Sequence, residues 1–143
     1  MAVGLQGSGE VTITFDDAAA APQIVTGFVM QMGKASIKVE TQSSDAFGDL
    51  WDEFAPTGRR GCPPIGISGL FNTTATTGPH VVFKPADADA LPNAATRTLV
   101  IVFGDSKTFT VETRISEYSV EAKNGKLSEY SCTLTPTGAA VWS

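Results

Sequence analysis

The stretch that decides the expected fold reads SDAFGDLWDEFAPTG and spans residues 44–58. Its large apolar residues recur at i, i+3, i+4 and i+7, the spacing that places side chains on one stripe of a helix. They are Phe47, Leu50, Trp51 and Phe54. A serine at position 43 or 44 can cap the helix, and Pro56 ends it. The pattern predicts one short amphipathic helix, over about residues 44–54, held by packing of its apolar face.

The remaining sequence alternates apolar and polar residues, which is the period of a strand with one buried face. Such segments are predicted at residues 11–15, 23–30, 35–41, 65–71, 97–103, 107–122 and 126–136, with a short extended piece at 81–84. Residues 1–9 are rich in glycine and are expected to form a flexible N-terminal arm. The sequence therefore predicts a mostly β protein. It is a single β-sandwich or barrel-forming domain, over residues 10–143, with one short flanking α-helix.

The two longest predicted strands form a hairpin. Lys123-Asn124-Gly125 is a turn signal, with Gly125 at the position of positive φ. The alternation slips before Tyr118, which predicts a β-bulge near Glu117. A three-residue loop places Tyr118 opposite Tyr130. One face of this hairpin carries mostly threonine, serine, glutamate and arginine, and we expect that face to contact water.

Composition argues against several classes of protein. The formal net charge is −5, whereas binding a phosphate backbone needs clustered lysine and arginine. The longest apolar run, Leu99–Phe103, is far shorter than the roughly 20 residues that cross a membrane. The first nine residues lack the basic and apolar regions of a signal peptide. Cys62 and Cys132 are therefore expected to be buried thiols rather than a disulfide.

Acidic residues gather in and around the predicted helix. They form a run without an intervening base: Glu40, Asp45, Asp49, Asp52 and Glu53. One interpretation is a solvated helix face and cap. The other is an acidic surface that lies beside a basic neighbour or a passing polyanion.

No arrangement of residues predicts catalysis. The chain has one histidine, His80, in a Gly-Pro-His loop, and a nucleophile triad needs a base. The residues Gly66-Ile67-Ser68-Gly69 do not have the spacing of a nucleophile elbow. Cys62, Cys132 and His80 do not have the spacing of a zinc site. The sequence predicts a protein that is not an enzyme and that holds no cofactor or metal.

Four motifs follow one another along the chain. They are DAFGDLWDEFAPTG at residues 45–58, ISGLFN at 67–72 with ATTGP at 75–79, ISEYSVE at 115–121, and TLTPTG at 133–138. In this order they resemble the major tail tube proteins of long-tailed (siphovirus-type) bacteriophages and related gene-transfer particles.

That resemblance implies a structural protein of a virion tail or phage-like particle, assembled in the cytoplasm of a bacterial host. Copies of the chain would form a six-fold ring whose strands join into one β-barrel. The rings would stack into a tube, and DNA would pass through it without specific binding. The other implied partners are a tape-measure protein, a tail terminator and distal tail or baseplate proteins, with no membrane and no cofactor.

A DNA channel needs walls that do not retain DNA, and hydroxyl and acidic side chains avoid the contacts that lysine and arginine make with phosphates. Long strands with unpaired edges also suit a ring, in which identical copies pair those edges. The candidate lumen-facing residues are Lys38, Glu40, Thr110, Glu112, Arg114, Ser116, Glu129, Ser131, Thr133 and Thr135. The alternative is a monomeric β-sandwich module that binds a carbohydrate or receptor through exposed aromatic residues such as Trp51, Tyr118 or Trp142.

Overall fold

Antiparallel strands make up most of the chain. The computed structural model describes residues 11–74 and 78–143, so the flexible N-terminal segment expected over residues 1–9 and the first three residues of the ATTGP motif lie outside the described residues. The strands are β1 (Thr12–Asp16), β2 (Pro22–Ile24), β3 (Gln31–Met32), β4 (Lys38–Ser43), β5 (Phe54–Gly61), β6 (Ile65–Leu70), β7 (Arg97–Val102), β8 (Thr108–Glu121), β9 (Glu129–Pro136) and β10 (Val141–Trp142). The helical elements are the α-helix α1 (Pro79–Phe83) and the 3-10 helices η2 (Thr26–Phe28), η3 (Asp87–Ala90) and η4 (Gly104–Ser106).

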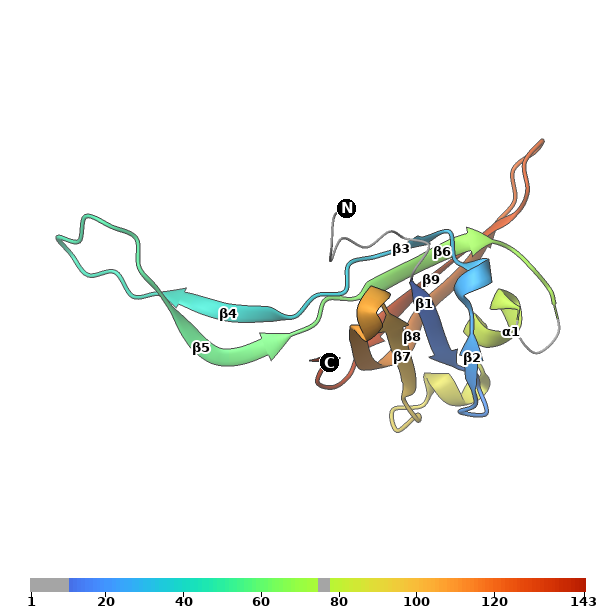
Figure 1. The fold of residues 1–143 in the computed structure, drawn as a ribbon, viewed down its shortest axis with the longest axis horizontal. Coiled ribbons are helices and arrows are strands. Elements are labelled where there is room, and N and C mark those ends of the chain that lie inside the picture. The colour runs from blue at the N-terminus through green and yellow to red at the C-terminus, as the bar shows by residue number, and fades with distance from the viewer. Residues whose placement is uncertain (1–10, 75–77) are drawn as a thin grey trace.

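One large sheet forms the body of the molecule. Its strands lie in the order β2-β1-β7-β8-β9-β6-β3, and β10 pairs with β8 beside this path. Strand β8 joins the two halves, because residues 108–113 pair with β7 and residues 113–121 pair with β9. The register shifts between Ile115 and Glu117, which confirms the bulge predicted in this strand. The two halves of the sheet lie at an angle to each other, as Figure 1 shows.

The apolar core lies on one side of this sheet. It is built from alternate residues of β1, β6, β7, β8 and β9, together with α1 and the loop before η2. Phe83 of α1 stacks between Phe15 and Tyr130, with ring centroids 5.3 Å and 5.8 Å away. Burying a side chain of this size contributes about 1.5–3 kcal/mol. The alternating pattern of the sequence therefore becomes a mostly β body with one packed face, as predicted.

The α-helix lies elsewhere than predicted. Residues 44–53 form the loop between β4 and β5, and Phe54 already belongs to β5. The side-chain oxygen of Asp49 accepts a hydrogen bond from the Ala46 N–H at 2.6 Å. Such local bonds compete with a helix for the backbone donors. Gly48 has a φ of +94°, outside the right-handed helical region.

The predicted helix face also lacks a surface to pack on. Phe47 and Leu50 are almost fully exposed, and Trp51 and Phe54 are 82% and 65% exposed. A short helix in water depends on burial of its apolar stripe. Without that burial, nothing compensates for the low helix propensities of Gly48 and of the aspartates, and the stretch forms a loop.

The observed helix α1 was expected to be loop and extended chain. Pro79 stands at its first position, where the missing N–H costs nothing. Its five residues are too few to show a helical period in the sequence, so only their burial in the structure distinguishes them from a strand. Behind α1, the buried guanidinium of Arg97 donates to the Val82 carbonyl at 2.9 Å and pairs with Asp89 of η3. This arginine anchors the chain between α1 and β7.

The β8–β9 hairpin has a different register from the one predicted. Tyr118 lies opposite Cys132, and Tyr130 lies opposite Val120, so the loop is longer than three residues. Gly125 nevertheless has a φ of +79°, as predicted. Both cysteines are free thiols, and burial raises the pKa of Cys132 to about 12. Among the described residues no helix is long and apolar enough to cross a bilayer.

Candidate assembly surfaces

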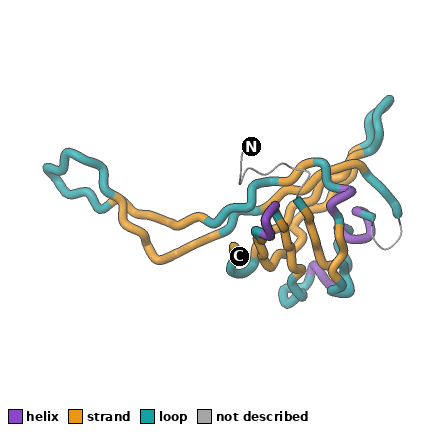
Figure 2. Tube along the Cα trace, in the orientation of Figure 1, coloured by secondary structure: helices purple, strands orange, loops and turns teal. Residues whose placement is uncertain are grey.

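Two surfaces of the molecule do not pack against its own hydrophobic core. The first is the outward face of β8 and β9, which we call the polar face. The second is the β4–β5 hairpin, which we call the arm, with its loop over residues 44–53 as the arm tip. Figure 2 shows the arm leaving the body as two strands that pair only with each other.

The polar face is set by the alternation of β9. Tyr130, Cys132 and Leu134 point into the core and are buried, so the residues between them point outward. Their partners on β8 come from the cross-strand register. The polar face consists of Arg114, Ser116, Glu117, Ser119, Glu121, Glu129, Ser131, Thr133 and Thr135.

Hydroxyl groups of the polar face bond to one another across the strands. The Ser119 Oγ lies 2.8 Å from the Ser131 Oγ, and the Ser116 hydroxyl contacts that of Thr135. Short side chains that satisfy each other in this way leave few groups to hold a ligand. The centre of the face therefore consists of paired hydroxyl groups, with the carboxylate of Glu117 opposite Thr133 between them.

Charge is distributed unevenly along the polar face. Glu117, Glu121 and Glu129 lie toward the hairpin loop, and the Glu121 carboxylate pairs with the Lys123 ammonium at 3.3 Å. At the other end Arg114 donates to the carbonyls of Pro92 and Ala94, at 3.3 Å and 3.0 Å. The arginine side chain is thus tied to the loop before β7. We expect it to be less available to a passing phosphate than a free lysine.

Not all ten predicted lumen residues lie on this face. Arg114, Ser116, Glu129, Ser131, Thr133 and Thr135 do. Thr110 and Glu112 lie on the same side of β8 but next to β7, where Glu112 accepts hydrogen bonds from the hydroxyls of Thr96 and Thr98. Lys38 and Glu40 lie on the arm.

The polar face also includes residues that the sequence did not single out. Glu117, Ser119 and Glu121 follow the bulge, and one extra residue at Ser116 returns them to the outward side. The slip in alternation was visible in the sequence. Continuing the new parity past the bulge would have found them.

One edge of β8 is unpaired. Strand β9 pairs with residues 113–121 on one edge, while β7 ends its pairing at Thr113 on the other. No strand among the described residues pairs with that second edge between Arg114 and Glu121. An unpaired edge of this length is a template for a strand from another chain.

The arm is a separate two-stranded sheet. Strand β4 pairs with β5, from Lys38 opposite Gly61 to Ser43 opposite Phe54, and every residue of both strands is exposed. An isolated two-stranded hairpin is at best marginally stable in water. The arm therefore needs contacts beyond its own two strands.

The arm tip combines apolar and acidic side chains. Phe47, Leu50 and Trp51 are exposed there, and large exposed apolar groups mark interaction surfaces. Asp45, Asp49 and Glu53 hold carboxylate oxygens within 4.8 Å of one another. All three are exposed, so this cluster is a negatively charged surface rather than a built metal site. Of the residues predicted to form a helix face, Phe47, Leu50 and Trp51 are thus exposed on the arm tip, and Phe54 is exposed at the start of β5.

Solved structures match this fold, although no family model and no curated protein matches the sequence. A chain in the tail of an empty gene transfer agent (GTA) particle, refined with C6 symmetry, has a TM-score of 0.69 at 13% identity, covering 97% of this chain and 99% of that one. A chain of the anti-feeding prophage baseplate, six-fold symmetrised, has a TM-score of 0.68 at 11% identity, covering 100% and 97%.

The SPP1 tail tube matches as well, with a TM-score of 0.66 at 14% identity over 96% of this chain and 78% of that one. At these identities the likeness concerns the fold, and it extends over almost the whole chain, arm included. The chain therefore has the tail tube fold, which it shares with tail and baseplate components of phage-like particles.

Proposed function

We propose that this chain is the structural subunit of a phage-like tail tube. Copies join into six-fold rings, and the rings stack around a channel that delivers DNA into a host cell. The observation that carries the proposal is the fold match over 97% of this chain and 99% of a chain from a C6-symmetric GTA tail. The role is structural and needs neither a cofactor nor a catalytic residue.

Ring formation is supported by the unpaired edge of β8. A neighbouring copy can supply a strand to that edge, and the same pairing repeated around a ring leaves no edge open. The outer edge of β6 is mostly covered within the chain, since β3 pairs with Ile67 and Ser68 and the N–H groups of Gly33 and Met30 donate to the carbonyls of Gly66 and Ser68. A strand of a neighbouring copy on the free edge of β8 would extend the polar face from one subunit toward the next.

The polar face is the proposed wall of the channel. Its hydroxyl groups are bonded to each other, and its exposed charges near the hairpin loop are acidic. A polyanion that passes such a wall meets no cluster of lysine and arginine, so no counterion-releasing contacts hold it. For Thr110, Glu112, Lys38 and Glu40, which lie outside this face, a lumenal position stays a prediction.

Electron microscopy of the purified protein at rising concentration tests the assembly. We expect rings, then tubes, with the subunit repeat visible in averaged images. A protein that stays monomeric at the highest soluble concentration, with sedimentation unchanged, contradicts the proposal.

A second experiment tests the channel wall. Replacing Ser131 and Thr133 by lysine places two cations per copy on the polar face, and we expect tubes that form but slow the passage of DNA. The matched control replaces Ala18 and Ala19, which are exposed in the turn between β1 and β2, by lysine. Equal DNA delivery by both variants contradicts a lumenal position for Ser131 and Thr133.

The proposal also assigns a location and partners. The chain resides in a virion tail or a related particle and is assembled in the bacterial cytoplasm. Its partners are copies of itself, a tape-measure protein inside the tube, a terminator at one end and distal tail or baseplate proteins at the other. Co-purification of the tube with these components from particles is the direct check.

One observation favours the second candidate, a monomeric binding module. Trp51 and Phe47 are exposed on the arm tip, as the aromatic platform of a carbohydrate-binding module would be. Glycan-array binding by a persistent monomer supports this candidate. Assembly that is lost when these two residues are replaced supports the first.

A further inference from the structure

The arm carries opposite charges at its two ends. The end next to the body, which we call the arm base, holds Lys34, Lys38, Arg59 and Arg60, all exposed. The arm tip holds Asp45, Asp49, Asp52 and Glu53, also exposed. Within the chain only one weak ion pair connects these groups with an acid of the arm, between Arg59 and Glu40 at 3.9 Å, among the described residues. Most of this charge is therefore available to a partner.

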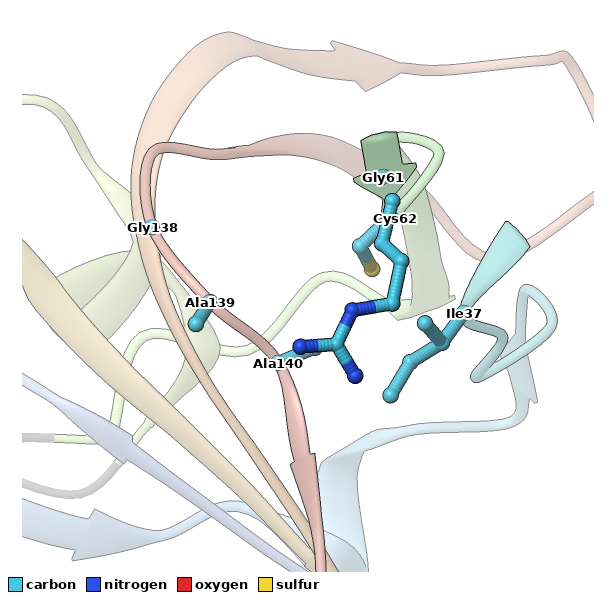
Figure 3. Close-up of a pocket in the computed structure, with 7 residues that line it drawn as sticks. Ile37, Gly61, Cys62, Gly138, Ala139 and Ala140 are labelled. Atoms are coloured by element: carbon cyan, nitrogen blue, oxygen red, sulfur yellow. The ribbon is translucent and has the colours of Figure 1, made fainter. Parts of the chain in front are cut away.

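A pocket lies at the arm base. It has a volume of about 320 Å³, and Figure 3 shows it between the end of β5 and the chain before β10. Its walls are mostly small or apolar, formed by Ile37, Cys62 and the segment Gly138–Ala140, and Arg60 adds a guanidinium. Over residues 11–74 and 78–143, Arg60 forms no side-chain hydrogen bond or ion pair within the chain. The pocket thus offers apolar contact and one unpaired cation together.

The arm tip has the complementary chemistry. Trp51 is a large apolar side chain that is 82% exposed, and its sequence neighbour Asp52 is an exposed acid. An aromatic anchor in a pocket beside a charge pair is the usual form of a strong interface contact. The tip cannot reach the base of its own arm, because six residues of extended strand separate them by about 20 Å. Figure 1 shows the arm tip and the arm base at opposite ends of the hairpin.

We propose that the arm tip of one copy binds in the arm-base pocket of a second copy, with Trp51 against Ile37 and the tip carboxylates facing Arg60. The contact joins two different surfaces, so a bound pair still has one free tip and one free pocket, and the contact can repeat along one direction. The length of the arm then sets the spacing of successive copies. This inference rests on the proposed tube, of which it supplies the longitudinal contact.

Crosslinking between thiols tests the contact in the assembled protein. Cys62 in the pocket wall provides one thiol, and Leu50→Cys or Asp52→Cys provides the other while Trp51 is kept. A short bis-maleimide is added to tubes, and chains are separated on a denaturing gel. Because each chain has one tip thiol and one pocket thiol, we expect a ladder of dimers, trimers and longer species.

Two controls identify the pair of thiols. Adding Cys62→Ser to the Leu50→Cys chain should remove the ladder. Leu127→Cys, which places an exposed thiol on the β8–β9 loop instead, should give less than a tenth of the ladder intensity. A charge test accompanies them: Arg60→Glu should raise the concentration needed for tube formation about tenfold, and Asp52→Lys in the same chain should restore it in part.

The outcomes separate this inference from the function it rests on. If the unmodified protein forms no rings or tubes, both the proposed function and the tip–pocket contact are wrong. If tubes form and neither tip thiol crosslinks to Cys62, the proposed function stands and the tip–pocket contact is wrong. If the ladder appears and depends on Cys62, the contact is supported.

Discussion

The body and the arm are both built from antiparallel strands, yet large apolar side chains are buried in the body and exposed in the arm. In the body, Phe83 of α1, Phe109 of β8 and Leu134 of β9 are fully buried. In the arm, Val39 and Phe54 lie exposed on paired strands, and Trp51 is exposed in the loop between them. Hydrophobic periodicity predicts that a residue will be buried. It does not predict whether the same chain or another chain will cover that residue.

The same contrast applies to charge. Arg97 of the body is buried, and its cation is matched inside the chain by Asp89. Arg60 and the acids of the arm tip are exposed and mostly unmatched. A chain whose body buries its own apolar residues can fold before the proposed assembly, in which neighbouring copies would cover the arm. Four pairs of substitutions, one in each region, test this division.

The largest difference is expected for phenylalanine. Phe83→Ala removes a ring stacked between two others, and we expect a loss of about 3–5 kcal/mol in the free energy of unfolding. Phe47→Ala at the arm tip should change that free energy by less than about 0.5 kcal/mol. Urea unfolding of the dilute protein measures both. Equal losses would mean that the arm tip packs on its own body.

Aspartate gives the second comparison. Asp89→Ala leaves the buried guanidinium of Arg97 without its carboxylate, which should cost about 3 kcal/mol. Asp49→Ala removes an exposed acceptor from the Ala46 N–H and should cost about 1 kcal/mol or less. Asp87→Ala, an exposed neighbour of Asp89, is the control for the substitution itself. Thermal unfolding should order the three variants in this way, and a stable Asp89→Ala protein would refute the anchoring role of the pair.

Glycine gives the third comparison. Gly125 and Gly58 both have positive φ, of +79° and +87°, a region that costs other residues about 1–2 kcal/mol. Gly125→Val should lower global stability by that amount and impair assembly, because its hairpin is continuous with the core. Gly58→Val should leave global unfolding unchanged and speed amide exchange in the arm alone. Hydrogen exchange read residue by residue distinguishes the two patterns.

Cysteine gives the smallest effect. Burial raises the pKa of the Cys132 thiol from 9.0 to about 12, so between these values the unfolded chain loses a proton that the folded chain keeps. Folding is unaffected by this group below pH 9, and stability falls as the pH rises above it. We expect a loss of about 1 kcal/mol between pH 9 and pH 10. Cys132→Ala should flatten this part of the profile, whereas Cys62→Ala should change it much less, and identical profiles would contradict the assignment.

The sequence predicts the body well because its signals there are local and agree with one another. Strands β1, β6, β7, β8 and β9, the bulge and the positive φ of Gly125 all follow from alternation and turn chemistry. The hairpin register was wrong by two residues, because pairing Tyr118 with Tyr130 looks favourable in isolation. In the structure those rings are diagonal neighbours, 6.3 Å apart.

The helix predicted over residues 44–54 is wrong, because the apolar residues there have helical spacing but no surface of the chain covers them. The spacing of Phe47, Leu50, Trp51 and Phe54 would suit a helix if a surface of the same chain covered them. Without such a surface, Gly48 and the aspartates favour a loop. Helix α1 was missed for the opposite reason: five residues carry too little pattern, and only the packing of Val82 and Phe83 defines them.

The bulge at Ser116 has a consequence for how this chain can vary. On either side of it, one hydroxyl or acid can replace another without altering which way the strand's residues point. Deleting that one extra residue would leave a regular ladder, in which Glu117 follows Ile115 on the outward side and Tyr118 still faces the core. Deleting a single residue between Glu117 and Glu121 instead would turn the residues beyond it to the opposite face. The strand can therefore lose a residue at the bulge, but not beyond it, without exchanging its two faces.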